Sequence, residues 1–312
     1  MLRELRIEGY RSLRDTYLKP RRVTVLVGPN GVGKTNLYRA LYLLHAAALG
    51  RLGRTIAEEG TLASVMWAGK RRRKPQLKLS VTFDEYRYNL ALGFPDKYLY
   101  TEYVNLGEIK PAIFPTDPIV KTEKLDLKVG SSWTAIARRR HAFSEARDLE
   151  AAWVQIQPEL PFAETMLGEL RDPGRFPHLW QLRDELARWR FYHDFRTDDS
   201  APIRQPTPAT FTPVLSPDGG DMAAALQTIL GEKNHEQSFL RSVLKDAFPL
   251  AEIATKTIGT HVVEPAEAEN ESPWVAGTHI IPTFRSTEID RAFGPQEMSD
   301  GTLRFLCLVT AL

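Results

Sequence analysis

The chain has 312 residues, of which 43% are hydrophobic and 26% are charged, and its net charge is +2. This balance is typical of a globular protein and does not by itself indicate a nucleic-acid partner, which would require a strongly basic face. The single cysteine, Cys307, excludes a disulfide within the chain and a metal site built on thiolates.

The chain carries no recognisable targeting or membrane segment. Charged residues are interleaved at the amino terminus, which argues against a signal peptide. No apolar stretch approaches the roughly 20 residues that span a bilayer. We therefore expect a soluble cytoplasmic protein without a membrane partner.

The first elements predicted in chain order are strands. Residues 2–8 alternate in polarity, and a second short strand is expected over residues 15–18, after a break at residues 9–12. Residues 23–27 form a short, mostly apolar and β-branched run. Such a run is typical of a strand buried on both faces of a sheet.

A phosphate-binding motif follows this run. Residues 28–35 match the pattern G-x-x-x-x-G-K-[ST] without deviation. Its glycines let successive backbone N–H groups point inward, and the next helix adds its positive amino-terminal end. Lys34 is expected to reach the β- and γ-phosphates, and the Thr35 hydroxyl to bind Mg²⁺. The sequence therefore predicts ATP and Mg²⁺ as ligands, with the cradle formed by Gly28, Asn30, Gly31, Val32, Gly33, Lys34, Thr35 and Asn36.

The middle of the chain predicts more strands and then helices. Apolar residues at helical spacing over 37–48 indicate a helix that ends near Gly50. Strand-like segments follow at residues 77–83, 86–92 and 98–106, and we expect them to form an antiparallel meander. Residues 143–189 are expected to be helical, with one helix opening at Pro177.

The last third predicts a mixed pattern. Residues 190–195 are expected to return to the sheet, and residues 197–216 to form a loop. Helices are expected over 222–230 and 236–247, and strands near 253–263 and 279–284. We expect one head with three parts: a P-loop and β lobe over 1–142, a helical insertion over 143–189, and a third lobe over 190–312.

Two observations narrow the class of P-loop protein. The Asn-Lys-x-Asp motif that reads guanine is absent from the sequence, which weakens a GTPase hypothesis. Near the end of the chain, Ser299 precedes Asp300, Gly301 and an apolar helical run, the pattern of a capped helix start. The exposed N–H groups of such a start can receive a second phosphate. An ordinary capped core helix is the alternative.

Residues 298–302, Met-Ser-Asp-Gly-Thr, resemble the Leu-Ser-Gly-Gly-Gln signature of ABC-type ATPases, which is often Leu-Ser-Asp-Gly-Thr in SMC- and RecF-like proteins. Residues 7–13, 28–31 and 35–37 also resemble the opening strand and P-loop of these families. The chain thus resembles the RecF/SMC-like ATPases of the AAA family in bacteria, which are related to the ATPase half of OLD-type nucleases. The resemblance implies an α/β P-loop NTPase fold, an ABC/SMC-type head with a mixed sheet, an antiparallel β meander and a helical insertion.

The same resemblance implies how the head works and what it serves. Two chains would pair head to tail as an ATP-dependent homodimer, with Ser299 and the Gly301 N–H of one chain closing in trans on the γ-phosphate held by Lys34 of the other. Arg11 stands where the family often places a residue near the nucleotide, although an exposed loop arginine is nearly as good an explanation. DNA repair or phage defence is the implied role, with DNA and a nuclease as candidate partners.

One catalytic part of this class is missing from the sequence. Hydrolysis needs an apolar strand ending in Asp-Glu after the signature helix, yet the sequence stops at Leu312. We therefore expect a truncated head, which leaves open an ATPase or a non-catalytic nucleotide-binding module. Asp84 and Glu85 also follow a strand, but alternation at residues 78–82 favours a solvent-facing strand and a turn there.

Two further alternatives complete the set of hypotheses. A P-loop phosphotransferase acting on a small molecule is disfavoured by the signature segment and by the large insertion. The basic runs 70–74 and 138–140 could contact DNA phosphates, but solvated loops are the commoner explanation.

Overall fold

The computed structural model describes residues 1–70, 75–95, 116–156, 160–232, 234–259, 261–263, 274–276, 278–286 and 290–311. The chain divides into two units, Met1–Trp189 and Arg190–Leu312. The predicted strand at 98–106 and residues 71–74 of the first basic run lie outside the described residues.

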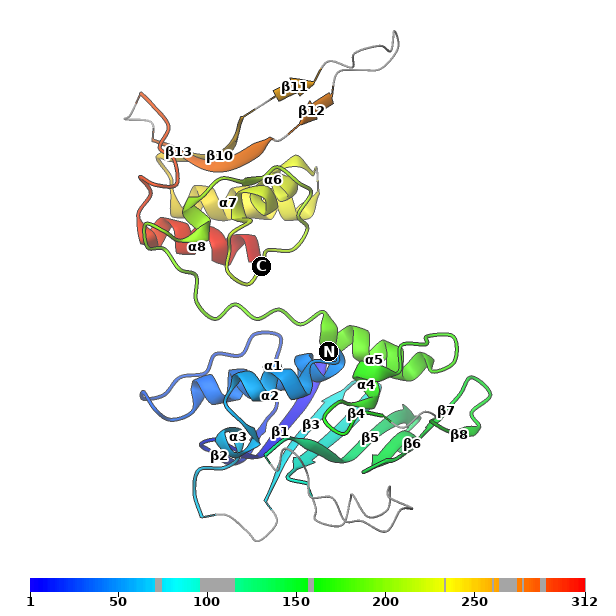
Figure 1. The fold of residues 1–312 in the computed structure, drawn as a ribbon. Helices are drawn as coiled ribbons and strands as arrows, with labels where there is room; N and C mark the ends of the chain where they lie inside the picture. The colour runs from blue at the N-terminus through cyan, green and yellow to red at the C-terminus, as the bar shows by residue number, and fades with distance from the viewer. Residues whose placement is uncertain are drawn as a thin grey trace. The chain divides into compact units, whose positions relative to one another are not determined.

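The first unit is built on a sheet of eight strands in the order β2-β1-β3-β4-β5-β6-β7-β8 (Figure 1). Each neighbouring pair is antiparallel, so the meander is confirmed for the predicted strands at 77–83 and 86–92, and the sheet continues to β8. The strands are β1 (Leu2–Tyr10), β2 (Leu13–Leu18), β3 (Gln76–Phe83), β4 (Tyr86–Gly93), β5 (Ile119–Val129), β6 (Ser132–Arg140), β7 (Phe143–Arg147) and β8 (Trp153–Gln155).

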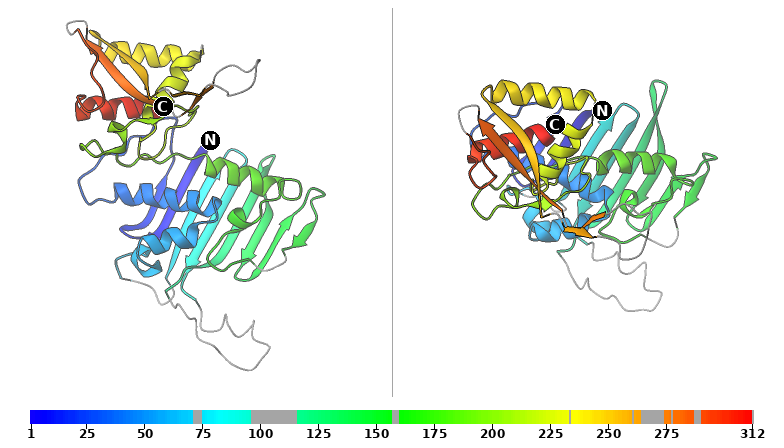
Figure 2. Two further views of the ribbon diagram at one scale, coloured as in Figure 1. Left: turned by 45° about the horizontal axis from the view of Figure 1, so that its top comes forward. Right: turned by 90° about the horizontal axis from the view of Figure 1, so that it is seen from above.

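Helices cover one face of this sheet (Figure 2). They are α1 (Lys34–Ala48), α2 (Leu52–Glu58), α3 (Leu62–Val65), α4 (Met166–Glu169) and α5 (Pro177–Ala187). Leu43 and Leu44 of α1 and Leu182 of α5 are fully buried in one core with Leu79 and Tyr88 of the sheet. The predicted helix after the P-loop and the helix opening at Pro177 are therefore confirmed, and their apolar residues hold them on the sheet.

The prediction of a strand at residues 23–27 is wrong, because that segment has no strand conformation in the structure. Val23 is 80% exposed, Val25 77% and Val27 91%. A strand buried on both faces needs hydrogen-bonded neighbours on each side, and β1 already pairs with β2 and β3. Among the described strands no parallel pair occurs, so the expected mixed sheet is also wrong for this part of the chain.

The helical prediction over 143–189 is wrong for its first part. Residues Phe143–Arg147 and Trp153–Gln155 are strands that continue the sheet. Ser144 and Ala146 are buried while their neighbours along β7 are more exposed, which is the two-residue period of a strand. The prediction that residues 190–195 return to the sheet is wrong too, because these residues form an irregular segment.

The second unit packs three helices with a small sheet of order β10-β13-β9. Its helices are η1 (Pro202–Arg204), α6 (Met222–Gly231), α7 (His235–Ala247) and α8 (Asp300–Ala311), and its strands are β9 (Thr207–Pro208), β10 (Ala251–Ile258), β11 (His261–Val263), β12 (Trp274–Ala276) and β13 (His279–Ser286). Leu226, Leu240 and Leu306 bring the three longer helices into one core. The helices predicted at 222–230, 236–247 and after Ser299 are confirmed.

None of the described helices combines the length and the apolar character that crossing a bilayer requires.

Candidate nucleotide-binding site

Two of the three glycines in residues 28–33 have a left-handed backbone conformation. Gly31 has φ 82° and Gly33 has φ 107°, in the left-handed region that favours glycine. A Cβ on Gly33 would also lie 2.7 Å from Ser12 Oγ. Gly33 therefore needs to be glycine for its conformation and for its close approach to the turn between β1 and β2.

Lys34 begins α1 and folds back over the loop. Its Nζ donates hydrogen bonds to the main-chain oxygens of Gly28, at 2.5 Å, and of Pro29, at 2.8 Å. These neutral acceptors hold the ammonium above the cradle. A phosphate oxygen placed there would offer a stronger, charge-assisted acceptor to the same ammonium.

The amino-terminal end of α1 fits an anion. Gly33 provides no side-chain cap, and the first turn carries no acidic residue. The N–H groups of this turn have no intrahelical acceptors and carry the positive end of the helix dipole. Thr35 is exposed in this turn. Its hydroxyl would bind Mg²⁺ together with phosphate oxygens, which matches the few protein ligands that Mg²⁺ takes beside a nucleotide.

The remaining predicted cradle residues lie in the same loop and first turn. Gly28, Asn30 and Val32 are exposed. Asn36 is held differently, because its Nδ2 donates to Ser12 Oγ at 2.8 Å. Ser12 thus binds Asn36 and leaves no room for a side chain at position 33, and sequence reasoning missed its role because a serine in a turn carries no distinguishing signal.

Arg11 points to a carboxylate rather than into the loop. Its Nη2 lies 2.6 Å from Glu59 Oε2, and Tyr10 Oη donates to the same oxygen at 2.9 Å. The Arg11 backbone has φ 45°. Burial, followed by the charge of Glu59, raises the pKa of the Tyr10 phenol. In this arrangement the partly buried Arg11 joins the β1–β2 turn to the end of α2, so it is not the exposed loop arginine that was the alternative, and its place near the nucleotide stays a prediction.

The signature segment forms a capped helix start in the second unit. Ser299 Oγ accepts a hydrogen bond from the Thr302 N–H at 3.1 Å and lies 2.8 Å from Thr302 Oγ1. Ser299, Asp300 and Gly301 are exposed, and an added Cβ on Gly301 would meet nothing nearer than Ser299 Oγ at 3.9 Å. The first turn of α8 is therefore open to an incoming group.

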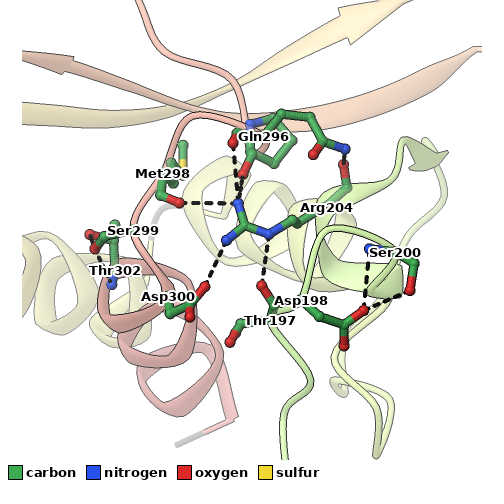
Figure 3. Close-up of polar contacts among 10 residues, drawn as sticks. Thr197, Asp198, Ser200, Arg204, Gln296, Met298, Ser299, Asp300 and Thr302 are labelled. Atoms are coloured by element: carbon green, nitrogen blue, oxygen red, sulfur yellow. Dashed lines mark hydrogen bonds and ion pairs between the residues drawn. The ribbon is translucent and has the colours of Figure 1, made fainter.

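A buried arginine fixes the loop before α8 (Figure 3). Arg204, 5% exposed, lies in η1 and follows Pro202. Its guanidinium donates to main-chain oxygens of Thr197 at 2.8 Å, Pro295 at 2.6 Å and Met298 at 3.1 Å, and to Asp300 Oδ1 at 2.8 Å. Sequence reasoning missed Arg204 because an arginine in a proline-rich stretch is indistinguishable from a surface residue.

The pair at residues 84 and 85 lies in the turn between β3 and β4, as expected. Asp84 accepts from Arg3 Nε at 2.6 Å and from the terminal amino group at 3.0 Å. Arg3 first, and then the amino group, lower the pKa of the Asp84 carboxyl. Lys78, Ser80 and Thr82 face away from the core, which confirms the alternation predicted for this strand.

Comparison with known proteins relates the amino-terminal part of the chain to a family of ATPases. Residues 1–127 match the family model described as AAA ATPase domain. No curated protein matches the chain. The matched range includes the whole cradle and the turn at Ser12 that contacts it. The amino-terminal part of this chain is therefore similar to an AAA-type ATPase domain. This similarity supports nucleotide binding and, as a general activity, ATP hydrolysis.

Proposed function

We propose that this chain is an ATP-binding ATPase of the ABC/SMC-like type, which dimerises head to tail around ATP–Mg²⁺ and serves DNA repair or phage defence. One observation carries the nucleotide assignment. Gly31 and Gly33 have positive φ, and Lys34, at the start of a 15-residue helix, folds its ammonium back onto the main-chain oxygens of Gly28 and Pro29. A triphosphate needs many donors and positive charge at short range, and this arrangement supplies both.

The residues of the loop have separate tasks in this proposal. Backbone N–H groups of residues 31–35 bind the β- and γ-phosphate oxygens, and Lys34 exchanges the oxygens of Gly28 and Pro29 for phosphate oxygens. Thr35 binds Mg²⁺, which neutralises charge on the phosphates when it is present. Ser12 holds Gly33 and Asn36 in place.

The head-to-tail dimer is supported by the start of α8. This helix has 12 residues, and its exposed first turn combines the Ser299 hydroxyl with the Gly301 N–H. Both are donors suited to a γ-phosphate presented by a second copy. Loss of the γ-phosphate would remove these contacts, so hydrolysis would favour opening of the dimer. DNA and a nuclease remain the partners that the resemblance implies.

Light scattering after size exclusion tests the dimer. We expect the full chain to be monomeric without nucleotide and dimeric with Mg²⁺ and a non-hydrolysable ATP analogue. Ser299→Asp should abolish the dimer, because it keeps the helix cap but faces the phosphates with a negative charge. Ser238→Asp, a change of the same kind at an exposed position of α7, is the matched control. Monomers at saturating nucleotide, or equal effects of both variants, would overturn the dimer.

A non-catalytic nucleotide-binding module is the second candidate. It is favoured by Asp84, whose carboxylate is engaged by Arg3 and the terminal amino group in an exposed turn. Phosphate release by the purified chain separates the two candidates. Release that Lys34→Ala abolishes would establish the ATPase, whereas nucleotide binding without release would establish the module.

A further inference from the structure

The sheet face opposite the helices of the first unit divides into two halves of different charge character. On β1, β2 and β3 the charges are balanced by ion pairs within β1 and between neighbouring strands. These pairs are Arg6 with Asp15 and with Glu8, and Lys78 with Glu8. This half offers little net charge to a partner.

On β4 to β8 the same face is basic. Alternation along the strands and the register between them place six cations and two carboxylates on this side. The cations are Arg87, Lys124, Lys128, Arg138, Arg140 and Arg147, and the carboxylates are Asp126 and Glu145. We call these six cations, together with Trp133 and Trp153, the basic face.

The two carboxylates contribute little to what a partner would meet. Asp126 pairs with Lys124 at 2.8 Å and its side chain is 4% exposed, whereas that of Lys124 is 51% exposed. Glu145 pairs with Arg138, and the two side chains are 13% and 57% exposed. The surface therefore presents mostly positive charge.

Two tryptophans are stacked with arginines on this face. The Arg87 guanidinium carbon lies 4.3 Å from the centroid of the Trp133 ring. The guanidinium carbons of Arg138 and Arg147 lie 4.8 and 4.9 Å from the centroid of the Trp153 ring. Arg147 also donates two hydrogen bonds to main-chain oxygens, so stacking and hydrogen bonds together fix its guanidinium. Cations and planar rings thus lie together on this half of the sheet.

The basic run 138–140 is divided by the strand that carries it. Arg138 and Arg140 are exposed on the basic face. Arg139 points to the opposite side, is 2% exposed, and donates to the main-chain oxygens of Pro161 and Glu164 at 2.9 and 2.5 Å. Two of the three arginines are therefore available to phosphates, and the third is structural.

We propose that the basic face binds single-stranded nucleic acid. Cations along a sheet match the repeating charge of a phosphate backbone, and arginine–tryptophan stacks give unpaired bases planar surfaces. Five strands at a spacing of about 4.8 Å span roughly 19 Å, enough for a few nucleotides. The inference uses the proposed function only for the class of partner, and it is independent of ATP.

Fluorescence anisotropy with a labelled thymidine oligomer of about 15 nucleotides tests this in the full chain without ATP. The double variant Lys128→Gln with Arg140→Gln should weaken binding roughly tenfold. The logarithm of its binding constant should also fall less steeply with the logarithm of the salt concentration, by about 1.4 in slope. Arg54→Gln with Arg188→Gln is the matched control, because it removes the same charge from exposed helix positions. Trp153→Leu should weaken binding about fivefold or more if bases stack there.

The outcomes separate this inference from the nucleotide site. The Lys34→Ala variant should bind the oligomer with the same affinity as the unchanged chain. A chain that binds ATP but not the oligomer at low salt would overturn the basic face alone. Equal losses in the two double variants would overturn it as well, and tighter binding of a duplex of the same length would overturn the assignment to single strands.

Discussion

Arg204 and Asp300 form an ion pair of 2.8 Å in which the arginine side chain is 6% exposed and the aspartate side chain 64%. The pair thus joins the interior of the second unit to the exposed first turn of α8. Because the same guanidinium donates to the oxygens of Pro295 and Met298, it holds the loop that places Ser299. Arg204 is therefore a positioning residue in the proposed dimer.

Arg204→Met should destabilise the second unit by about 3 kcal/mol, because buried main-chain oxygens lose a charged donor. Asp300→Asn should cost less than about 1 kcal/mol, since its side chain is largely solvated and the amide oxygen can still accept. Urea unfolding of both variants measures the difference. Equal and small effects would show that the Arg204 contacts do not hold the loop.

The cap of α8 can be separated from its proposed contact with phosphate. Ser299→Ala should lower the free energy of unfolding by about 1 kcal/mol, because the Thr302 N–H loses its acceptor, whereas Ser299→Asp should leave it nearly unchanged. Thermal unfolding followed by circular dichroism measures both. A stable alanine variant would argue against the cap.

Gly33→Ala should destabilise the first unit by at least about 2 kcal/mol and weaken ATP binding. The added Cβ would have to accept φ 107° and a distance of 2.7 Å from Ser12 Oγ. Gly231→Ala, at the end of α6 with open space around it, should change stability by less than about 1 kcal/mol. Unfolding curves and nucleotide titrations of both variants provide the comparison.

Cys307 should report opening of the second unit. Burial, and then the charges of Asp221 and Asp218, raise the pKa of its thiol to about 12. In the unfolded chain the thiol ionises near its ordinary pKa of about 8.5. At pH 8 a disulfide reagent should therefore react at least about 100-fold more slowly with the native chain than in urea. A rapid native reaction would contradict the burial of Cys307.

The same shift predicts how stability depends on pH. The raised pKa means that the folded state keeps a proton that the unfolded state loses between about 8.5 and 12. The stabilising contribution of Cys307 is complete below pH 8.5 and declines as the pH rises through this range. Cys307→Ala should flatten the pH dependence of unfolding in that window, and an unchanged profile would rule out this contribution.

Local patterns predicted much of the fold and the position of the candidate site in the chain. The apolar spacing after the P-loop pattern predicted α1, and the pattern itself marks the candidate cradle, because both depend on residues close in sequence. The strands β1 to β4 followed from alternation, and α8 from Ser299 and the apolar run behind it. Each of these features is encoded within about ten residues.

The features that sequence analysis missed depend on distant partners. Residues 23–27 have the composition of a buried strand, yet none of the described strands pairs with them. Arg204 binds residues more than 90 positions away, and Arg11 pairs with Glu59 across 48 positions. No local pattern distinguishes such arginines from solvated ones, so their roles emerge only from the folded chain.

Titration of the chain with a fluorescent ATP analogue and Mg²⁺ tests the central claim most directly. We expect saturable binding that unlabelled ATP displaces and that Lys34→Ala weakens at least about 100-fold, because the ammonium at the cradle is lost. Lys245→Ala, in the last turn of α7, should bind as the unchanged chain does. Absence of saturable binding, or equal affinities of the Lys34→Ala variant and the unchanged chain, would contradict the account.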